Sequence, residues 1–190
     1  MSITQKIINK YNKIPSFLFY NEFAELLEIK IKEIFSIEDS ILDAAEEIAL
    51  NSPRKRFIIA LHNSLEETAH RMINTMAKGT FASPHMHDDP NTSEELVALR
   101  GSACVIEFSD DGKIINRLPF GESYNTNLIE IKPNSIHTVI PLTKTVTLFE
   151  VKGQTSYNPS KDKFFYPWAP KEGDDPKVIN KYLKLLENEK

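Results

Sequence analysis

The sequence has a single cysteine, no long apolar run and no signal-like N-terminus, and each absence excludes a class of protein. Cys104 stands alone, which excludes an internal disulfide framework and a cysteine-based zinc site, and its small and β-branched neighbours indicate a buried thiol. No segment approaches the roughly 20 apolar residues that cross a bilayer. Lysines recur through the first 13 residues, and the apolar block Phe17–Tyr20 is too short for a signal peptide. We therefore expect a cytoplasmic protein.

An excess of basic charge is also missing. The 190 residues contain 23 Lys and Arg against 27 Asp and Glu, a formal net charge of -4, and the longest basic cluster is Arg54-Lys55-Arg56. Nucleic acids and anionic membranes require a concentrated basic face, so neither is expected as a partner. A hydrophobic content of 41% over this length is typical of one globular domain with a sizeable core.

The first 50 residues show helical periodicity. Apolar residues at spacings of three, four and seven predict one helix, with a face made of Tyr20, Phe23, Ala24, Leu27, Ile31 and Ile34. Pro15 and Ser16 separate it from a possible shorter helix, and a further amphipathic helix ends at Asn51–Pro53. We expect residues 1–50 to form a helical extension that packs on the rest of the chain or on a partner subunit.

From Phe57 onward the pattern changes to short β-like runs separated by turns. These runs are 57–61, 71–76, 80–87, 95–99, 103–108, 114–118, 128–131, 137–140 and 145–151. They predict an antiparallel barrel or sandwich over residues 54–175, with the aromatic tail from Gly153 to Asp175 wrapped around it. Residues 176–190 are predicted to form a C-terminal helix, and the residues expected on its apolar face are Val178, Tyr182, Leu185 and Leu186.

Three histidines and an acid in this β region suggest a metal site. His85 and His87 are two residues apart, so in a strand both side chains point to the same side. Glu94 and Glu95 begin the next run, and His137 begins a later one. Three imidazoles with one carboxylate suit Fe(II), Mn, Ni, Co or Zn better than Ca or Mg, and an octahedral ion would keep two open positions.

The spacing of these residues resembles the first motif of the cupin superfamily. That motif has a glycine, five residues, His-x-His, a short loop, and a glutamate six residues before a second glycine. Gly79, His85, His87, Glu94 and Gly101 match it, with a longer loop, and the spacing to the second glycine selects Glu94 over Glu95. The second motif corresponds to Pro133-Asn-Ser-Ile-His137, with its glycine missing and one residue deleted. The resemblance implies metal ligands His85, His87, Glu94 and His137.

A closer resemblance is to the WbuC-type cupin metalloproteins, which are associated with bacterial surface-polysaccharide (O-antigen) gene clusters. It runs from about Ile37 to Asp175 and includes SILDAAEEIALNSPRKR, SPHMHDDP, LVALRG, DDGKI and the tail LFEVKGQTSYNPSKDKFFYPWAPKEGD. It implies an all-β cupin (double-stranded β-helix or jelly-roll) barrel with one bound transition metal. It also implies a role on a sugar or nucleotide-sugar intermediate of surface-polysaccharide synthesis.

Three residues near the predicted strand ends are candidates for the ligand pocket. His62 could belong to the pocket or to a capped surface position, and His70 could have a pocket role. Arg71 could bind an anionic group such as a sugar phosphate through paired hydrogen bonds, or it could form a salt bridge to one of the many acids.

The tail and the last long strand provide further candidates. Glu150 and Lys152 share one face of a strand, and they line the pocket if the opposite, apolar face does not. Tyr157, Lys163 and Trp168 could form a lid over the pocket, or they could simply pack the tail against the barrel.

Three functions remain open from the sequence. The first is a metal-dependent enzyme, such as an isomerase or epimerase, in which the metal polarises a carbonyl or hydroxyl of a sugar-like or anionic small molecule. The second is an iron(II)-dependent dioxygenase, and the third is a non-catalytic metal or small-ligand sensor. Exposed sheet edges predict a homodimer, in which the first helix could take part.

Overall fold

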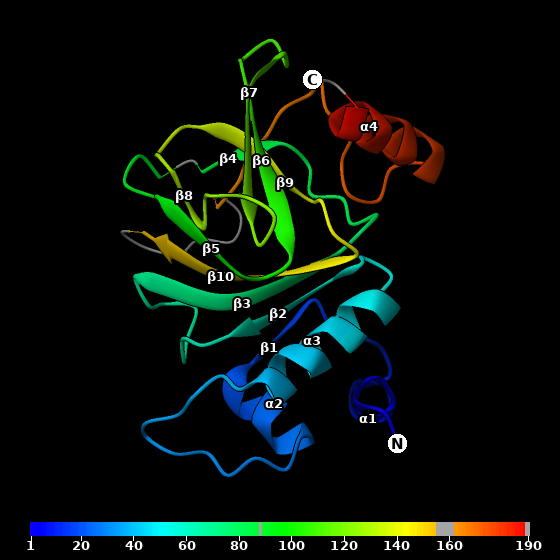
Figure 1. The fold of residues 1–190 in the computed structure, drawn as a ribbon, viewed down its shortest axis with the longest axis vertical. Coiled ribbons are helices and arrows are strands. Elements are labelled where there is room, and N and C mark those ends of the chain that lie inside the picture. The colour runs from blue at the N-terminus through cyan, green and yellow to red at the C-terminus, as the bar shows by residue number, and fades with distance from the viewer. Residues whose placement is uncertain (88, 155–161, 189–190) are drawn as a thin grey trace.

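The computed structural model of the chain describes residues 1–87, 89–154 and 162–188, and in it two β-sheets lie between helical layers (Figure 1). The larger sheet has the order β1 (Phe17–Phe19), β2 (Arg56–Ala60), β3 (Ala69–Ala77), β10 (Thr145–Gly153), β5 (Glu94–Arg100), β8 (Leu128–Ile131). The smaller has the order β11 (Phe164–Phe165), β4 (His85–Met86), β9 (Ile136–Pro141), β6 (Ser102–Phe108), β7 (Ile114–Gly121). The described strand pairs are antiparallel except β1 with β2.

Helices cover the outer faces of the two sheets. The helices α1 (Ile3–Tyr11), α2 (Tyr20–Leu26) and α3 (Asp39–Asn51) gather against the larger sheet, and α4 (Pro176–Asn188) lies beside the smaller one (Figure 1). Among the described residues, no helix combines the length and apolarity needed to cross a bilayer.

The strand alternation produces three separate cores. Ala103 and Val105 of β6 pack between the sheets, whereas Cys104 and Ile106 pack on the outer face with Leu186 of α4. A third cluster joins the outer face of the larger sheet to α1, α2 and α3. This is the period-two pattern of strands that are buried on both faces. The predicted buried thiol is thus confirmed, and burial raises the pKa of Cys104.

The predicted fold class is confirmed: a two-sheet jelly-roll β core carries N-terminal helices and a C-terminal helix. The two sheets face each other but do not close into a continuous barrel. Gly101 joins β5 to β6 with φ +68°, and a Cβ there would lie 2.4 Å from the Thr145 carbonyl oxygen. Only glycine fits this turn, which sends the chain from one sheet to the other.

The N-terminal helix prediction was too long. Helix α2 ends at Leu26, since Glu28 adopts a left-handed conformation (φ 60°) and the Ile29 N–H donates to the Ala24 carbonyl oxygen at 2.9 Å. Ile34, placed on the same apolar face by its spacing, is 90% exposed. The segment 28–32 also alternates polar and apolar residues, so its helical spacing was not a unique signal.

Two further expectations were only partly right. The predicted strand 80–87 is reduced to His85–Met86, because residues 80–84 form no ladder and Pro84 has no N–H to donate. Helix α4 forms, but Val178 and Leu185 are exposed, and its buried residues are Leu183 and Leu186.

Candidate metal centre

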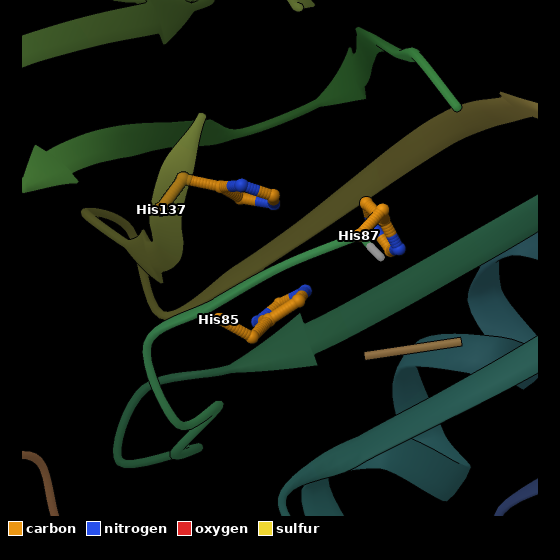
Figure 2. A group of neighbouring side chains, drawn as sticks. All are labelled: His85, His87 and His137. Atoms are coloured by element: carbon orange, nitrogen blue, oxygen red, sulfur yellow. The ribbon is translucent and has the colours of Figure 1, made fainter. Parts of the chain in front are cut away.

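Three buried histidines converge between the sheets. His85 begins β4, His87 follows that strand, and His137 lies on β9 directly opposite His85 in the ladder. Figure 2 shows the three imidazoles directed toward a common centre, and one ring nitrogen of each lies within 4.8 Å of the others. The structure therefore brings together histidines that are about 50 residues apart in the chain.

Backbone carbonyls determine which nitrogen of each ring faces the centre. The Nδ1 atoms of His85, His87 and His137 lie 2.9, 2.9 and 3.0 Å from the carbonyl oxygens of Ser83, Asp162 and Ser135. A carbonyl oxygen can only accept, so each Nδ1 carries the proton and each Nε2 presents a lone pair. This arrangement, with Nδ1–H on a carbonyl and Nε2 bare, is the usual state of a metal-binding histidine.

The carboxylate of Glu94 meets two of these bare nitrogens. Its two oxygens lie 2.8 Å from His87 Nε2 and 3.2 Å from His137 Nε2, and the Glu94 side chain is only 7% exposed. In this tautomer, lone pairs of nitrogen and oxygen face each other at contact distance. Such an arrangement is repulsive unless a metal ion, or a second proton on each imidazole, lies between the atoms.

The donor set fits a divalent transition metal. An ion bound at about 2.0–2.2 Å from each ligand has a coordination shell roughly 4 Å across, close to the spread of the three histidine nitrogens. The Nε2 atoms of His85 and His87 are buried and make no hydrogen bond within the described part of the chain. Three imidazoles and one carboxylate could therefore hold such an ion after small side-chain movements.

Burial also sets the protonation of the site. Loss of solvent contact, helped by the positive charge of Lys163, lowers the pKa of His85 well below its ordinary value. Burial alone would raise the pKa of Glu94, but His137 and His87, when protonated on Nε2, donate hydrogen bonds to the carboxylate, and these outweigh burial and hold this pKa well below its usual range. At neutral pH the centre therefore offers a neutral imidazole at His85 and a carboxylate at Glu94.

The larger sheet carries polar residues next to the centre. Three residues lie side by side on adjacent strands of this sheet, in the order His70, Lys152, Glu94. Lys152 is 5% exposed and forms an ion pair with Asp162. The conditional prediction for β10 is thereby resolved: its polar face lines the pocket, and the opposite face packs toward the helices.

Glu150 is a second carboxylate near the metal centre. Its Oε2 accepts a hydrogen bond of 2.7 Å from Asn74 Nδ2, and burial, followed by the charge of Glu94, raises its pKa. A cavity of about 50 Å³, enough for one or two waters, is lined by Glu150 together with Glu94, His85 and His137. Space for a water or a substrate atom therefore lies beside the candidate ligands.

A larger cavity of about 190 Å³ adjoins the same carboxylates and also contacts His62, His70 and Lys163. We call it the histidine cavity. Five of the sequence candidates for the pocket thus lie on its wall, namely His62, His70, Glu150, Lys152 and Lys163.

The other candidates lie elsewhere. Arg71 forms an ion pair of 2.8 Å with Glu67 and does not line the histidine cavity. Trp168 packs on Phe108 with ring centroids 5.3 Å apart, which is tail-to-barrel packing and not a lid. Tyr157 lies outside the described residues.

Sequence reasoning missed several residues of the site. Asp162 provides both the carbonyl for His87 and the partner of Lys152, but it is 75 residues from His87 and no local signal marks it. Phe17 lines the histidine cavity from the short strand β1. Asn74 was the most recognisable of the three, since it is a polar residue within the otherwise apolar part of β3.

Comparisons with known proteins give a family of unassigned role and distant structural likenesses. A family described as a domain of unknown function (DUF6016) matches residues 37–120, and no curated protein matches the chain. The capsular polysaccharide assembling protein CapF of Staphylococcus aureus is 12% identical, with a TM-score of 0.45, and the match covers 57% of this chain and 29% of CapF. A mutant oxalate decarboxylase of Bacillus subtilis is 19% identical, with a TM-score of 0.42, over 52% of this chain and 24% of the decarboxylase.

A third likeness is to a cupin superfamily protein of Desulfitobacterium hafniense, with 11% identity and a TM-score of 0.41, over 52% of this chain and 77% of that protein. This chain spans less than a third of CapF and of oxalate decarboxylase. Of these three proteins, the one from Desulfitobacterium hafniense is named as a cupin superfamily protein, and with TM-scores below 0.5 none of the three likenesses carries a conclusion about this chain.

Proposed function

We propose that this chain binds one divalent transition metal through His85, His87, Glu94 and His137 and is a metal-dependent enzyme acting on a small polar molecule. One observation carries the proposal. The Nε2 atoms of His87 and His137, whose Nδ1 protons are bound by carbonyl oxygens, lie 2.8 and 3.2 Å from the Glu94 carboxylate. Fe, Mn, Ni, Co and Zn all suit these ligands.

The residues around the centre suit a reaction on bound substrate. When bound, the metal would supply a Lewis acid that polarises a carbonyl or hydroxyl of the substrate. Glu150, held by Asn74, is a carboxyl group next to the centre that could take or return a proton. The Lys152–Asp162 pair forms part of the wall of the histidine cavity.

The substrate part of the proposal is a sugar or nucleotide-sugar intermediate of bacterial surface-polysaccharide synthesis. Its support is the sequence resemblance to WbuC-type proteins over Ile37 to Asp175, especially the tail. A cytoplasmic location and a homodimer belong to the same proposal. The strands at the sheet edges are available for pairing between subunits, and they are β1, β8, β7 and β11.

The metal centre is tested by elemental analysis of protein purified without chelators or nickel resin. We expect about one transition metal per chain. Glu94→Gln should weaken binding by more than ~100-fold, since loss of a partner outside the coordination shell already costs 10–100-fold. Glu95→Gln is the matched control, because Glu95 is the next residue, accepts a hydrogen bond from Ser93 at 3.2 Å and points to the opposite face of β5 from Glu94. Equal metal content in the two variants would refute the ligand assignment.

Activity assays separate the three functions. Metal-dependent isomerisation or epimerisation of a sugar nucleotide by the purified protein would support the proposed enzyme. Oxygen consumption that requires added iron(II) and a substrate would point instead to a dioxygenase. Binding of a sugar nucleotide without turnover, at full metal occupancy, would indicate a sensor.

A further inference from the structure

The histidine cavity extends from the metal centre toward the N-terminal part of the chain. On its floor, Glu94 of β5, Lys152 of β10 and His70 of β3 stand in one row across three adjacent strands. Neighbouring strands lie about 4.8 Å apart, so the row spans roughly 10 Å. A molecule bound here could contact the metal ligands at one end and the histidines at the other.

His62 has an unused hydrogen-bonding atom at this cavity. The side chain is buried (3% exposed) and stacks on His70 with ring centroids 4.2 Å apart and an interplanar angle of 3°. Its Nε2 is buried and makes no hydrogen bond within the described residues. Buried polar atoms normally have a partner, so this atom points to a ligand or water that completes the site.

The backbone indicates which kind of partner His62 requires. Its Nδ1 lies 3.2 Å from the Arg71 N–H and 3.1 Å from the Arg71 carbonyl oxygen. That oxygen already accepts a hydrogen bond from the Leu61 N–H at 2.8 Å. The arrangement that satisfies both backbone groups has Nδ1 as the acceptor, which leaves the proton on Nε2. His62 therefore offers a donor to an oxygen atom of the ligand.

The charges around the cavity balance. Among the described residues, and apart from Glu94, which belongs to the metal centre, the charged residues of the wall are Glu150, Asp162, Lys152 and Lys163. Two carboxylates offset two ammonium groups, and Lys152 and Asp162 are paired with each other. A phosphate or carboxylate would need a surplus of cationic donors. This wall therefore favours an uncharged ligand. The Lys152–Asp162 ion pair can donate hydrogen bonds to the hydroxyl groups of such a ligand and accept hydrogen bonds from them.

The apolar part of the lining continues the same face of the larger sheet toward the N-terminal strand β1. Ile58 and Ala60 of β2 and Met72 of β3 lie on it, and Phe17 of β1 stands beside Ile58 in the parallel ladder. A volume of about 190 Å³ corresponds to roughly six waters at ~30 Å³ each. The space admits one small ring with its substituents and excludes a complete nucleotide.

We infer that the histidine cavity binds an uncharged, hydroxyl-rich ring of the size of one monosaccharide. A ring oxygen or hydroxyl accepts from His62 Nε2–H, the Lys152–Asp162 pair binds further hydroxyls, and the C–H face of the ring packs on Phe17. The inference rests on the proposed function, since it specifies the part of the same substrate that lies away from the metal. For a nucleotide sugar, only the sugar would occupy the cavity.

The test is a titration of metal-free and metal-loaded protein, followed through the imidazole NMR signals of His62. The probes are D-glucose, D-galactose, D-mannose, L-fucose and N-acetyl-D-glucosamine, with D-glucuronate and glucose 6-phosphate as charged counterparts. We expect at least one uncharged sugar to shift these signals in both forms of the protein and to bind more tightly than the charged probes. Absence of any shift with all five uncharged sugars, or tighter binding of the charged probes, would overturn the inference.

Two variants locate the contacts. His62→Phe keeps a flat ring against His70 but removes the donor, and the Kd of the bound sugar should rise about tenfold, as expected for one lost hydrogen bond. Phe17→Ala, at a half-exposed edge position (37% exposed), should also raise the Kd without affecting folding. Arg71→Lys, outside the cavity, is the control. An unchanged Kd in both cavity variants would contradict the assignment.

Metal analysis of the same samples separates the two proposals. His62→Phe should retain about one metal per chain. Sugar binding by a wild-type protein that takes up no metal even when metal is supplied would refute the proposed metal centre and leave the cavity assignment intact. Protein that holds its metal but binds no sugar would refute the cavity assignment and leave the metal centre intact.

Discussion

The ring orientation of each of the three candidate histidine ligands depends on one backbone carbonyl. For His85 and His137 the carbonyl lies two residues earlier in the chain, so the local turn itself holds the ring. For His87 it belongs to Asp162, from the tail. Two of the three rings are therefore oriented by their own strands, and the third requires the C-terminal region to be in place.

The first residue-scale prediction concerns pH. Because burial lowers the pKa of His85 in the folded state, the unfolded chain binds a proton there first, and stability falls as pH drops below about 6.5. The loss cannot exceed ~1.4 kcal/mol per pH unit for this residue. Urea unfolding of the metal-free protein between pH 7.5 and 5.5 measures it.

His85→Gln is the variant that isolates this effect. It removes the titrating group, so its stability should depend less on pH than that of the wild-type protein over the same range. Parallel curves for the two proteins would show that other groups account for the acid sensitivity.

The convergence of the three histidines could be anticipated from the sequence. His85 and His87 are two residues apart, and the resemblance to the cupin motifs singled out His137 and, as the predicted carboxylate ligand, Glu94 instead of Glu95. Asp162 could not be predicted, since nothing near it in the chain records that it meets His87 and Lys152. Contacts between distant segments are fixed by packing of the whole fold and leave no periodic trace.

At the scale of elements, α1 acts through one buried stripe. Ile7 is fully buried (0% exposed) in the cluster beneath the larger sheet, whereas its neighbour Ile8 is 37% exposed. Ile7→Ala should lower the free energy of unfolding by about 2–4 kcal/mol through lost burial and a cavity. Ile8→Ala, with the same chemistry and nearly the same helix position, should change it by less than ~1 kcal/mol.

Chemical denaturation of both variants measures the difference. Equal effects would mean that α1 contributes only helix propensity and that its packing on α3 and the sheet adds little. The contrast also tests whether the first residues belong to the cooperative unit of the β core.

Element boundaries show where local sequence stops being informative. The strands from Ala103 to Val151 were predicted within a few residues, because alternation and the Asp-Gly turn mark their ends. Strand β1 was missed, since three residues carry no periodicity and its parallel pairing with β2 is a long-range contact. The helix expected through Ile34 ended early, because no apolar surface lies there to cover that residue.

At the scale of the whole molecule, the tail is held by Glu172. Its two oxygens contact Arg56 Nη2 at 2.6 Å and Arg54 Nη2 at 2.8 Å, and the Arg56 side chain is only 11% exposed. Burial tends to raise the pKa of Glu172, but the two arginines outweigh it and lower this pKa. Glu172→Gln should destabilise the protein by about 2–3 kcal/mol, since a buried guanidinium loses its counter-ion.

Glu130→Gln is the matched control for this prediction. Glu130 pairs with Lys132 at 2.5 Å, but their side chains are 45% and 72% exposed, so its loss should change stability by less than ~0.5 kcal/mol. Thermal unfolding of both variants decides the matter. Similar melting temperatures would show that the arginine pair contributes nothing to anchoring the tail.

The bond from His87 to Asp162 also has a consequence for protein synthesis. A ribosome delivers residue 162 only after all four candidate ligands, so a nascent chain can carry every donor while one ring still lacks its orienting carbonyl. Metal capture in its final geometry would then wait until Asp162 has left the ribosome. A stalled or truncated product that lacks the tail would hold the ion more loosely, which would favour exchange over retention during biogenesis.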